Sequence, residues 1–232
     1  MARHLLVTLA LLLVTIPAAY SQVPAQDTDE DTFPTLRSKH QVGLRLGGWI
    51  NGGDEIPELA IDTVSGAILQ TSIKSGSFYF EVYGAYSVLP QTFIELSIGI
   101  VNRGSVTIEE GPFQDVGNLI VYPILLQLKW YPVAALRSKF QPYVGVGGGI
   151  YHGRQDVQFS NNVFFSTLRE DHETDINYTL AAGADWLLND FLALEFHGRY
   201  MPIKFSNALV TATDYNAVSI TVGIKYLYRS KK

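Results

Sequence analysis

The ten residues FLALEFHGRY, Phe191 to Tyr200, alternate between large apolar side chains and small or polar ones. In an extended chain one side would carry leucine, phenylalanine and tyrosine, and the other would carry Glu195, His197 and Arg199. A period of two residues indicates a β-strand with one dry and one wet face. The acid, the imidazole and the guanidinium would suit a catalytic site. They would equally suit the wet side of a strand whose dry side meets a large apolar phase.

The same period recurs along most of the chain. Each segment is about 11 to 14 residues long, close to the roughly 9–11 that a tilted strand needs to cross a bilayer. Strands of globular proteins are usually only about 5–6 residues long. The predicted strands cover residues 40–50, 77–88, 92–103, 118–131, 141–153, 175–188, 191–202 and 216–228.

The connections between these strands alternate in length. Residues 89–91, 132–140 and 189–190 form short turns, whereas 51–76, 104–117, 154–174 and 203–215 form long loops. Short periplasmic turns and long extracellular loops are typical of bacterial outer-membrane barrels. The 51–76 loop is less polar than a simple spacer, so it would either fold over the barrel mouth or form a hairpin that extends the sheet.

Parity separates the residues of every predicted strand into two sets. No Asp, Glu, Lys or Arg occupies an even-numbered position, and most large aliphatic residues do. The odd set is small, polar and charged. Away from the strand ends it contains the bases Arg45, Lys129, Arg199 and Lys225 and the acids Glu81, Glu95, Asp185 and Glu195.

Two architectures show this alternation. In a soluble barrel the apolar set points inward, and in a membrane barrel it points outward to lipid. The long uniform apolar face and the alternating loops favour lipid, as do two sets of aromatic residues near the strand ends. Those at the short-turn end are Trp130, Trp186, Tyr226 and Tyr228, and those at the other end are Phe78, Tyr178 and Tyr200. We therefore predict an all-β, eight-stranded antiparallel up-and-down transmembrane β-barrel.

The charged set would then fill the interior. An eight-stranded barrel has room only for its own side chains, and buried charges persist when they are paired. We predict an internal ion-pair network in place of a catalytic site. Its members are Arg45, Glu81, Glu95, Lys129, Asp185, Glu195, His197, Arg199 and Lys225. Glu95, Lys129, Asp185, Glu195 and Lys225 should cluster toward the periplasmic half, with Glu81 and Arg199 meeting nearer the outside.

The N-terminus has the pattern of a secretory signal peptide over residues 1–21. A basic start precedes an apolar run of about 12 residues, from Leu5 to Ile16, shorter than the ~20 of a membrane-spanning anchor. Ala19 and Ser21 supply the small residues of a cleavage site. Residues 22–39 read as an exposed acidic periplasmic leader, 40–228 as the barrel, and 229–232 as a basic tail.

The composition and the motifs argue against several classes of function. The chain has no cysteine, and its net charge of −5 gives no electrostatic case for nucleic acid. The glycine run at 144–149 continues a strand, whereas a phosphate loop needs a following helix. His172 lies with Asp171, Glu173 and Asp175 in a polar segment that could bind a cation weakly, although a solvated loop is the expectation. His197 has no serine two residues away on its strand. We expect no catalytic residue, cofactor or metal.

Four segments carry a resemblance to a known family: VYPILLQLKWYP (121–132), FQPYVGVGGGIYHG (140–153), YTLAAGADWLLNDFLALEFHGRY (178–200) and VSITVGIKYLY (218–228). They resemble strands of the small OmpA-like and OmpW-like outer-membrane β-barrels over about residues 117–228. The resemblance implies a bacterial outer-membrane location, contact with outer-membrane lipid and lipopolysaccharide, and recognition of the C-terminal strand by the barrel-assembly machinery.

Three functions follow from the resemblance and the interior charges. A non-enzymatic structural or surface-interaction role comes first. OmpW-like barrels are also associated with passage of small hydrophobic solutes, so a narrow channel is the alternative. A lipid A-modifying enzyme, which the scaffold also supports, is the third.

Overall fold

The computed structural model describes Leu36 and residues 39–51, 59–61, 68–73, 76–108, 114–134, 138–161, 165–209, 212–214 and 216–228. These residues form strands and connections, and none of them belongs to a helix long and apolar enough to cross a membrane. The strands are β1 (His40–Asn51), β2 (Leu59–Ile61), β3 (Ile68–Ile73), β4 (Gly76–Leu89), β5 (Thr92–Ile108), β6 (Gln114–Trp130), β7 (Phe140–Asn161), β8 (Phe165–Leu187), β9 (Leu192–Met201), β10 (Lys204–Leu209), β11 (Ala212–Asp214) and β12 (Ala217–Tyr228).

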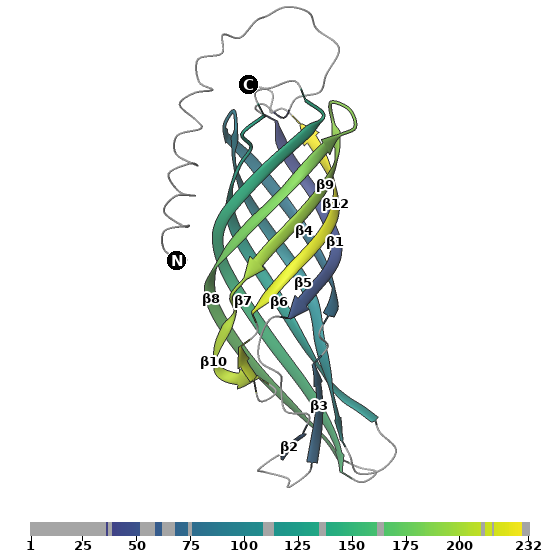
Figure 1. The fold of residues 1–232 in the computed structure, drawn as a ribbon. Coiled ribbons are helices and arrows are strands. Elements are labelled where there is room, and N and C mark those ends of the chain that lie inside the picture. The colour runs from purple at the N-terminus through teal and green to yellow at the C-terminus, as the bar shows by residue number, and fades with distance from the viewer. Residues whose placement is uncertain are drawn as a thin grey trace, which may run out of the picture.

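Eight long strands close into a ring in the order β1-β4-β5-β6-β7-β8-β9-β12 (Figure 1). β1 closes it by pairing with β4 on one side and with β12 on the other, from His40↔Tyr228 to Asn51↔Ala217. All neighbours in the ring are antiparallel. The eight-stranded antiparallel barrel predicted from the sequence is confirmed.

The apolar set faces outward. Leu126, Phe196 and Ile220 are 55%, 55% and 59% exposed, whereas Glu95 and Lys129 are fully buried. A soluble barrel would show the reverse arrangement. The exposed belt is therefore the surface that meets lipid, and the ionisable set lines the lumen.

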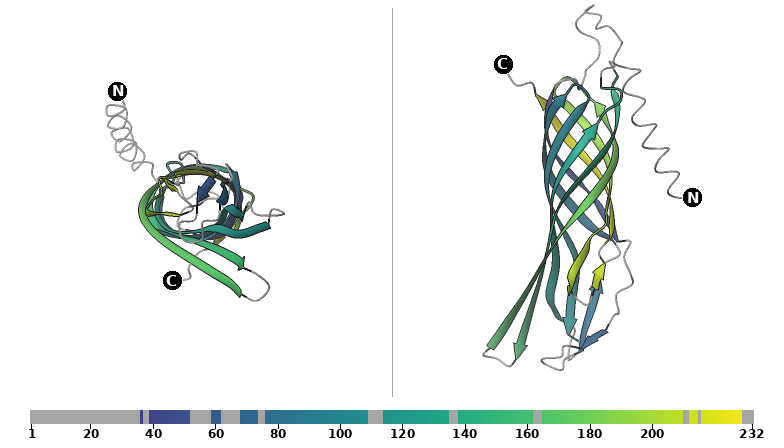
Figure 2. Two further views of the ribbon diagram at one scale, coloured as in Figure 1. Left: turned by 90° about the horizontal axis from the view of Figure 1, so that it is seen from below. Right: turned by 90° about the vertical axis from the view of Figure 1, so that its left-hand side faces the viewer.

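Two of the predicted long loops are largely strand. β5 continues to Ile108 and β6 starts at Gln114, while β7 continues to Asn161 and β8 starts at Phe165. Beyond the bilayer both faces of a sheet can meet water, so the apolar alternation stops although the backbone ladder continues. These strands run well past the rest of the ring (Figure 2). In the 51–76 segment β2 pairs with β3, and β3 pairs with β5, so part of this segment extends the sheet.

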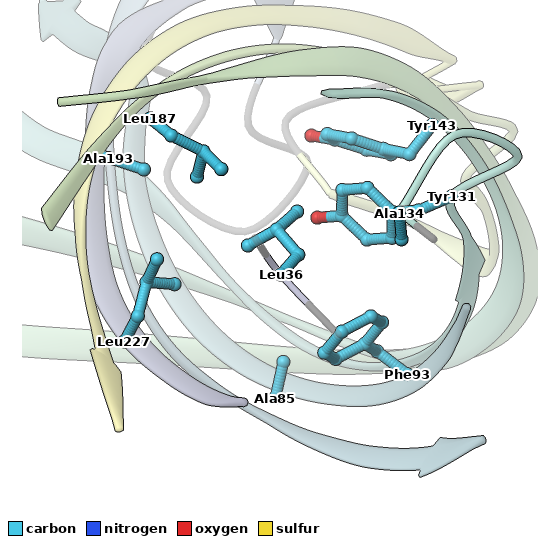
Figure 3. Close-up of a cluster of buried hydrophobic side chains, with 9 residues drawn as sticks. All are labelled: Leu36, Ala85, Phe93, Tyr131, Ala134, Tyr143, Leu187, Ala193 and Leu227. Atoms are coloured by element: carbon cyan, nitrogen blue, oxygen red, sulfur yellow. The ribbon is translucent and has the colours of Figure 1, made fainter. Parts of the chain in front are cut away.

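The periplasmic end is closed from inside. Leu36 is fully buried in the lumen (Figure 3), in a cluster that we call the periplasmic seal. The seal consists of Leu36, Ala85, Phe93, Tyr131, Ala134, Tyr143, Leu187, Ala193 and Leu227. Lys39 is also buried, and its Nζ lies 3.0 Å from Asp190 Oδ1.

The position of Leu36 and Lys39 corrects the expectation of an exposed leader at this point. Leu36 buries apolar surface that the predominantly acidic composition of residues 22–39 concealed. The predicted signal peptide (1–21), the rest of the leader and the basic tail (229–232) lie outside the described residues.

Interior glycines make room for interior rings, which gives a first prediction. A Cβ at Gly99 would lie 2.6 Å from the Tyr79 ring, whereas one at the outward Gly84 would meet nothing within 4 Å. Gly99→Val should lower the free energy of unfolding by about 1–3 kcal/mol through overpacking. Urea unfolding of the folded barrel in detergent micelles measures it, with Gly84→Val as the matched control. Equal losses in the two variants would contradict the prediction.

Candidate functional site

The lumen is organised around the guanidinium of Arg45. Its Nε donates to Glu195 Oε2 at 2.8 Å, and its Nη2 donates to Glu95 Oε2 at 2.7 Å. Its Nη1 is ion-paired with Glu81. Arg45 therefore joins carboxylates from β4, β5 and β9, and all four side chains are fully buried. A charge-assisted hydrogen bond to a guanidinium is among the stronger polar contacts in proteins.

Two lysines complete the periplasmic half of the network. Lys129 Nζ lies 2.6 Å from Glu95 Oε2 and 3.2 Å from Glu195 Oε1. Lys225 Nζ lies 2.7 Å from Asp185 Oδ2 and 3.4 Å from Glu195 Oε1. The structure thus brings together the five residues that the sequence analysis assigned to this half.

The extracellular half contains the Arg199–Glu81 pair. The two side chains form an ion pair, and Arg199 Nη2 also donates to Gln127 Oε1 at 3.2 Å. Glu81 accepts a further hydrogen bond from the Tyr79 hydroxyl. Because Glu81 also pairs with Arg45, the two halves form one continuous network.

Tyrosines support the central acid, and the sequence analysis did not assign them. The hydroxyls of Tyr83 and Tyr143 each donate to Glu195 at 2.6 Å. A Cβ at Gly43 would lie 2.6 Å from the Tyr83 hydroxyl, and one at Gly183 would lie 2.5 Å from that of Tyr143. The signal was present in the sequence, because large tyrosines and glycines share the inward parity. Parity alone, however, does not show which glycine faces which ring.

His197 differs from its predicted place in an ion pair. Its Nδ1 lies 2.6 Å from the Tyr143 hydroxyl, so its hydrogen bond goes to a phenol and not to a carboxylate. The Tyr143 hydroxyl also contacts Glu195, so His197 is connected to the network through Tyr143. The imidazole and the Glu195 carboxylate lie on the same face of β9 two residues apart, and the phenol from β7 lies against both.

A layer of aromatic and cationic side chains lies on the extracellular side of the network. Trp49 and Tyr79 meet edge to face with ring centroids 5.2 Å apart. The Arg103 guanidinium lies 5.6 Å from the Trp49 ring, within cation–π range. Arg103 is fully buried, although its position at a predicted strand end left it out of the predicted network.

The predicted aromatic girdle faces outward. Phe78, Tyr178 and Tyr200 are exposed toward the extracellular end, as are Trp186, Tyr226 and Tyr228 toward the periplasmic end. Trp130 is half-buried. Amphipathic aromatic rings favour the membrane–water interface. Their positions mark the approximate limits of the apolar belt.

The chemistry of the lumen is that of paired charges. The four acids and four bases of the periplasmic and extracellular halves are all buried. The acids accept hydrogen bonds from neighbouring cations or phenols. Within the described residues no group of three His, Asp or Glu side chains converges as metal ligands. The arrangement can hold the strands together and exclude water.

Comparison with known proteins decides the family. The model of the OmpW family matches residues 81–225, more than half of the chain. The chain belongs to the OmpW family. Its location is therefore the bacterial outer membrane, in agreement with the outward apolar belt. The search of curated proteins found no match.

A solved structure shares the fold of this OmpW-family chain. The outer membrane protein OprG from Pseudomonas aeruginosa aligns with a TM-score of 0.55 at 17% identity, covering 86% of this chain and 100% of that one. Neisserial surface protein A aligns with a TM-score of 0.49 at 12% identity, covering 81% and 95%. At 17% identity the likeness to OprG concerns the fold alone.

Glu195 offers a second prediction, because it accepts from Arg45, Lys129, Tyr83 and Tyr143 at once. Glu195→Gln keeps the shape but leaves buried cations one anion short. Breaking a buried pair in this way typically costs 3–5 kcal/mol, and urea unfolding of the barrel should show a loss of that order. The control is Asp190→Asn, another acid-to-amide change.

In the control the lost carboxylate is solvent-exposed. Asp190 is 80% exposed in its pair with Lys39. Lys39 Nζ also donates to the backbone oxygen of Asp190 at 2.7 Å, so the buried ammonium keeps a partner in the variant. A pair with one solvated member should contribute about 1 kcal/mol. A Glu195→Gln barrel as stable as Asp190→Asn would show that the buried network does not hold the strands together.

Proposed function

We propose that this OmpW-family protein is a non-catalytic outer-membrane barrel with a closed lumen, serving a structural or surface-interaction role. The observation that carries the proposal is the burial of Arg45, Glu81, Glu95, Lys129, Asp185, Glu195, Arg199 and Lys225 across one continuous section of the barrel. These residues come from seven of the eight ring strands, and β7 adds Tyr143. A hydrated ion crossing this section would have to separate charges that compensate one another.

The periplasmic seal supports the same proposal. On the periplasmic side of the network, Leu36 packs with Phe93, Tyr131 and Leu227 inside the barrel. An aqueous path along the axis would therefore meet an apolar layer as well as a charged one. What remains accessible is the outer surface and the extracellular extension formed by the ends of β5 to β8.

The cheapest test is ion conductance. Protein reconstituted in a planar bilayer should give no steady current, because both layers exclude hydrated ions. An open porin inserted under the same conditions provides the positive control. A current that grows with the amount of inserted protein and with salt concentration would contradict the closed lumen.

A second candidate function is passage of small hydrophobic solutes. It is favoured by apolar side chains that are buried on the extracellular side of the network, among them Val101, Val121, Met201 and Ile203. A hydrophobic solute that entered there would be stopped by the charged section, so it would have to leave the lumen on the extracellular side of that section. Liposomes loaded with an enzyme that reports on a small hydrophobic substrate separate the two candidates. Faster uptake without ion current supports passage, and unchanged uptake supports the closed structural role.

The proposal also covers lipid and assembly. The belt of exposed apolar residues meets outer-membrane lipid, and we propose lipopolysaccharide as its outer-leaflet partner. The barrel-assembly machinery would recognise β12 through the outward Ile224, Tyr226 and Tyr228, which are all exposed. A lipid A-modifying activity would contradict the non-catalytic role, and release of fatty acid from lipid A by the purified protein is the assay for it.

A further inference from the structure

Two histidines that are twenty residues apart in the sequence lie together on the outer face of β7 and β8. The register pairs His152 with Thr174 and Arg154 with His172, so the two histidines are diagonal neighbours of the same parity. Their ring centroids are 5.6 Å apart, with planes inclined by 17°. His172 was expected in a solvated loop, but β8 extends over it and pairs with β7, which brings His172 beside His152.

The pair lies at the extracellular edge of the apolar belt. Ile176, on the same outward parity of β8 as His172, is 76% exposed, and Tyr178 beside it belongs to the aromatic girdle. His172 itself is exposed, and His152 is half-buried. The two imidazoles therefore face the boundary between lipid and external water, where a dissolved ion could reach them.

We propose that His152 and His172 form a binding site for a divalent first-row transition-metal ion such as Zn²⁺, Cu²⁺ or Ni²⁺. Imidazole nitrogen is a preferred ligand of these ions. Two imidazoles that share one ion through bonds of about 2.0–2.1 Å bring their ring centres to roughly 5–6 Å. The observed separation of 5.6 Å falls in that range. Because the lone pair of an imidazole nitrogen lies in the ring plane, the two nearly parallel rings must also turn so that one nitrogen of each points at the shared ion.

Thr174 supplies an orienting contact. Its Oγ1 lies 3.0 Å from His152 Nδ1. When Nδ1 carries the proton and donates it to this hydroxyl, the lone pair of Nε2 is available to the metal. Metal-ligating histidines usually have such a hydrogen bond on the second ring nitrogen, which fixes the tautomer and the ring orientation.

The site is open. Because no third His, Asp or Glu joins the pair within the described residues, water or an external molecule completes the coordination. Such a site exchanges its ion, unlike the closed four-ligand sites that hold structural zinc. An ion bound there would tie β7 to β8 in the part of the hairpin beyond Leu180, where the pairing of β8 with β9 ends.

Arg154 distinguishes this proposal from an anion site. It is the cross-strand partner of His172, and a positive charge opposes a bound cation while it would favour a phosphate. Arg154→Gln should therefore leave metal affinity unchanged or raise it. A phosphate-bearing ligand would lose affinity in the same variant.

The experiment uses the full barrel, purified in micelles without a histidine tag and titrated with ZnCl₂ by calorimetry. Wild type should bind one ion. His152→Ala and His172→Ala should each weaken binding by more than tenfold, and Thr174→Val by about tenfold. The Cu²⁺ form should show two nitrogen ligands by electron paramagnetic resonance, and one in each histidine variant.

His40→Gln is the matched control. His40 lies at the opposite end of the barrel, stacked on Tyr86 at 4.3 Å, so its replacement should leave affinity unchanged. Heat-modifiable gel mobility checks that each variant is folded, and His172→Gln replaces His172→Ala if the latter is not. Absence of Zn²⁺, Cu²⁺ and Ni²⁺ binding by wild type, or equal binding by wild type and both histidine variants, would overturn the proposal. Binding of inorganic phosphate in place of metal, lost in Arg154→Gln, would also overturn it.

Discussion

The pairing of Glu195 with three cations is the constraint on which the rest of the lumen depends. Arg45, Lys129 and Lys225 all lie within ion-pair distance of this one carboxylate. A narrow barrel cannot solvate these groups with bulk water, so each charge must find its partner across the lumen. Those partners belong to strands far apart in the sequence, and the network is satisfied only when the ring has closed in the correct register.

The same constraint explains the composition of the inner face. A lumen filled by arginine, lysine and tyrosine side chains has no space for more, so glycine occurs where a tyrosine ring lies over the neighbouring strand. Gly99 beneath Tyr79 and Gly183 beneath Tyr143 show this directly. The outer face has no such restriction, because acyl chains adapt to its shape. Glycine there, as at Gly84, leaves open space.

The features that could be predicted from the sequence are those that follow from the alternation of inward and outward side chains. Features that do not depend on this alternation were missed. The sequence predicted the eight strands, their outward apolar face and the four acids and four bases of the inner network, because one side of each strand meets lipid. It did not predict the tyrosines that donate to Glu195 or the phenol partner of His197. It missed the outer halves of β7 and β8, where water on both faces removes the alternation. It also missed Leu36, a single apolar residue in an acidic segment whose burial requires the barrel mouth around it. His152 and His172 came together only through the strand extension, so no sequence spacing could have revealed the pair.

The ion pairing in the lumen and the closure of its periplasmic end limit where an external ligand could bind along the barrel axis. In the membrane section each of the eight charged side chains of the network has at least one ion-pair partner, so a ligand would have to break strong contacts in order to bind. At the periplasmic end the chain closes the lumen with its own Leu36. The extracellular ends of β7 and β8 lie outside both this network and the seal, and His172 and Thr174 are exposed there. If the interior serves the proposed closed structural role, recognition of external partners is expected to involve mainly the extracellular extension.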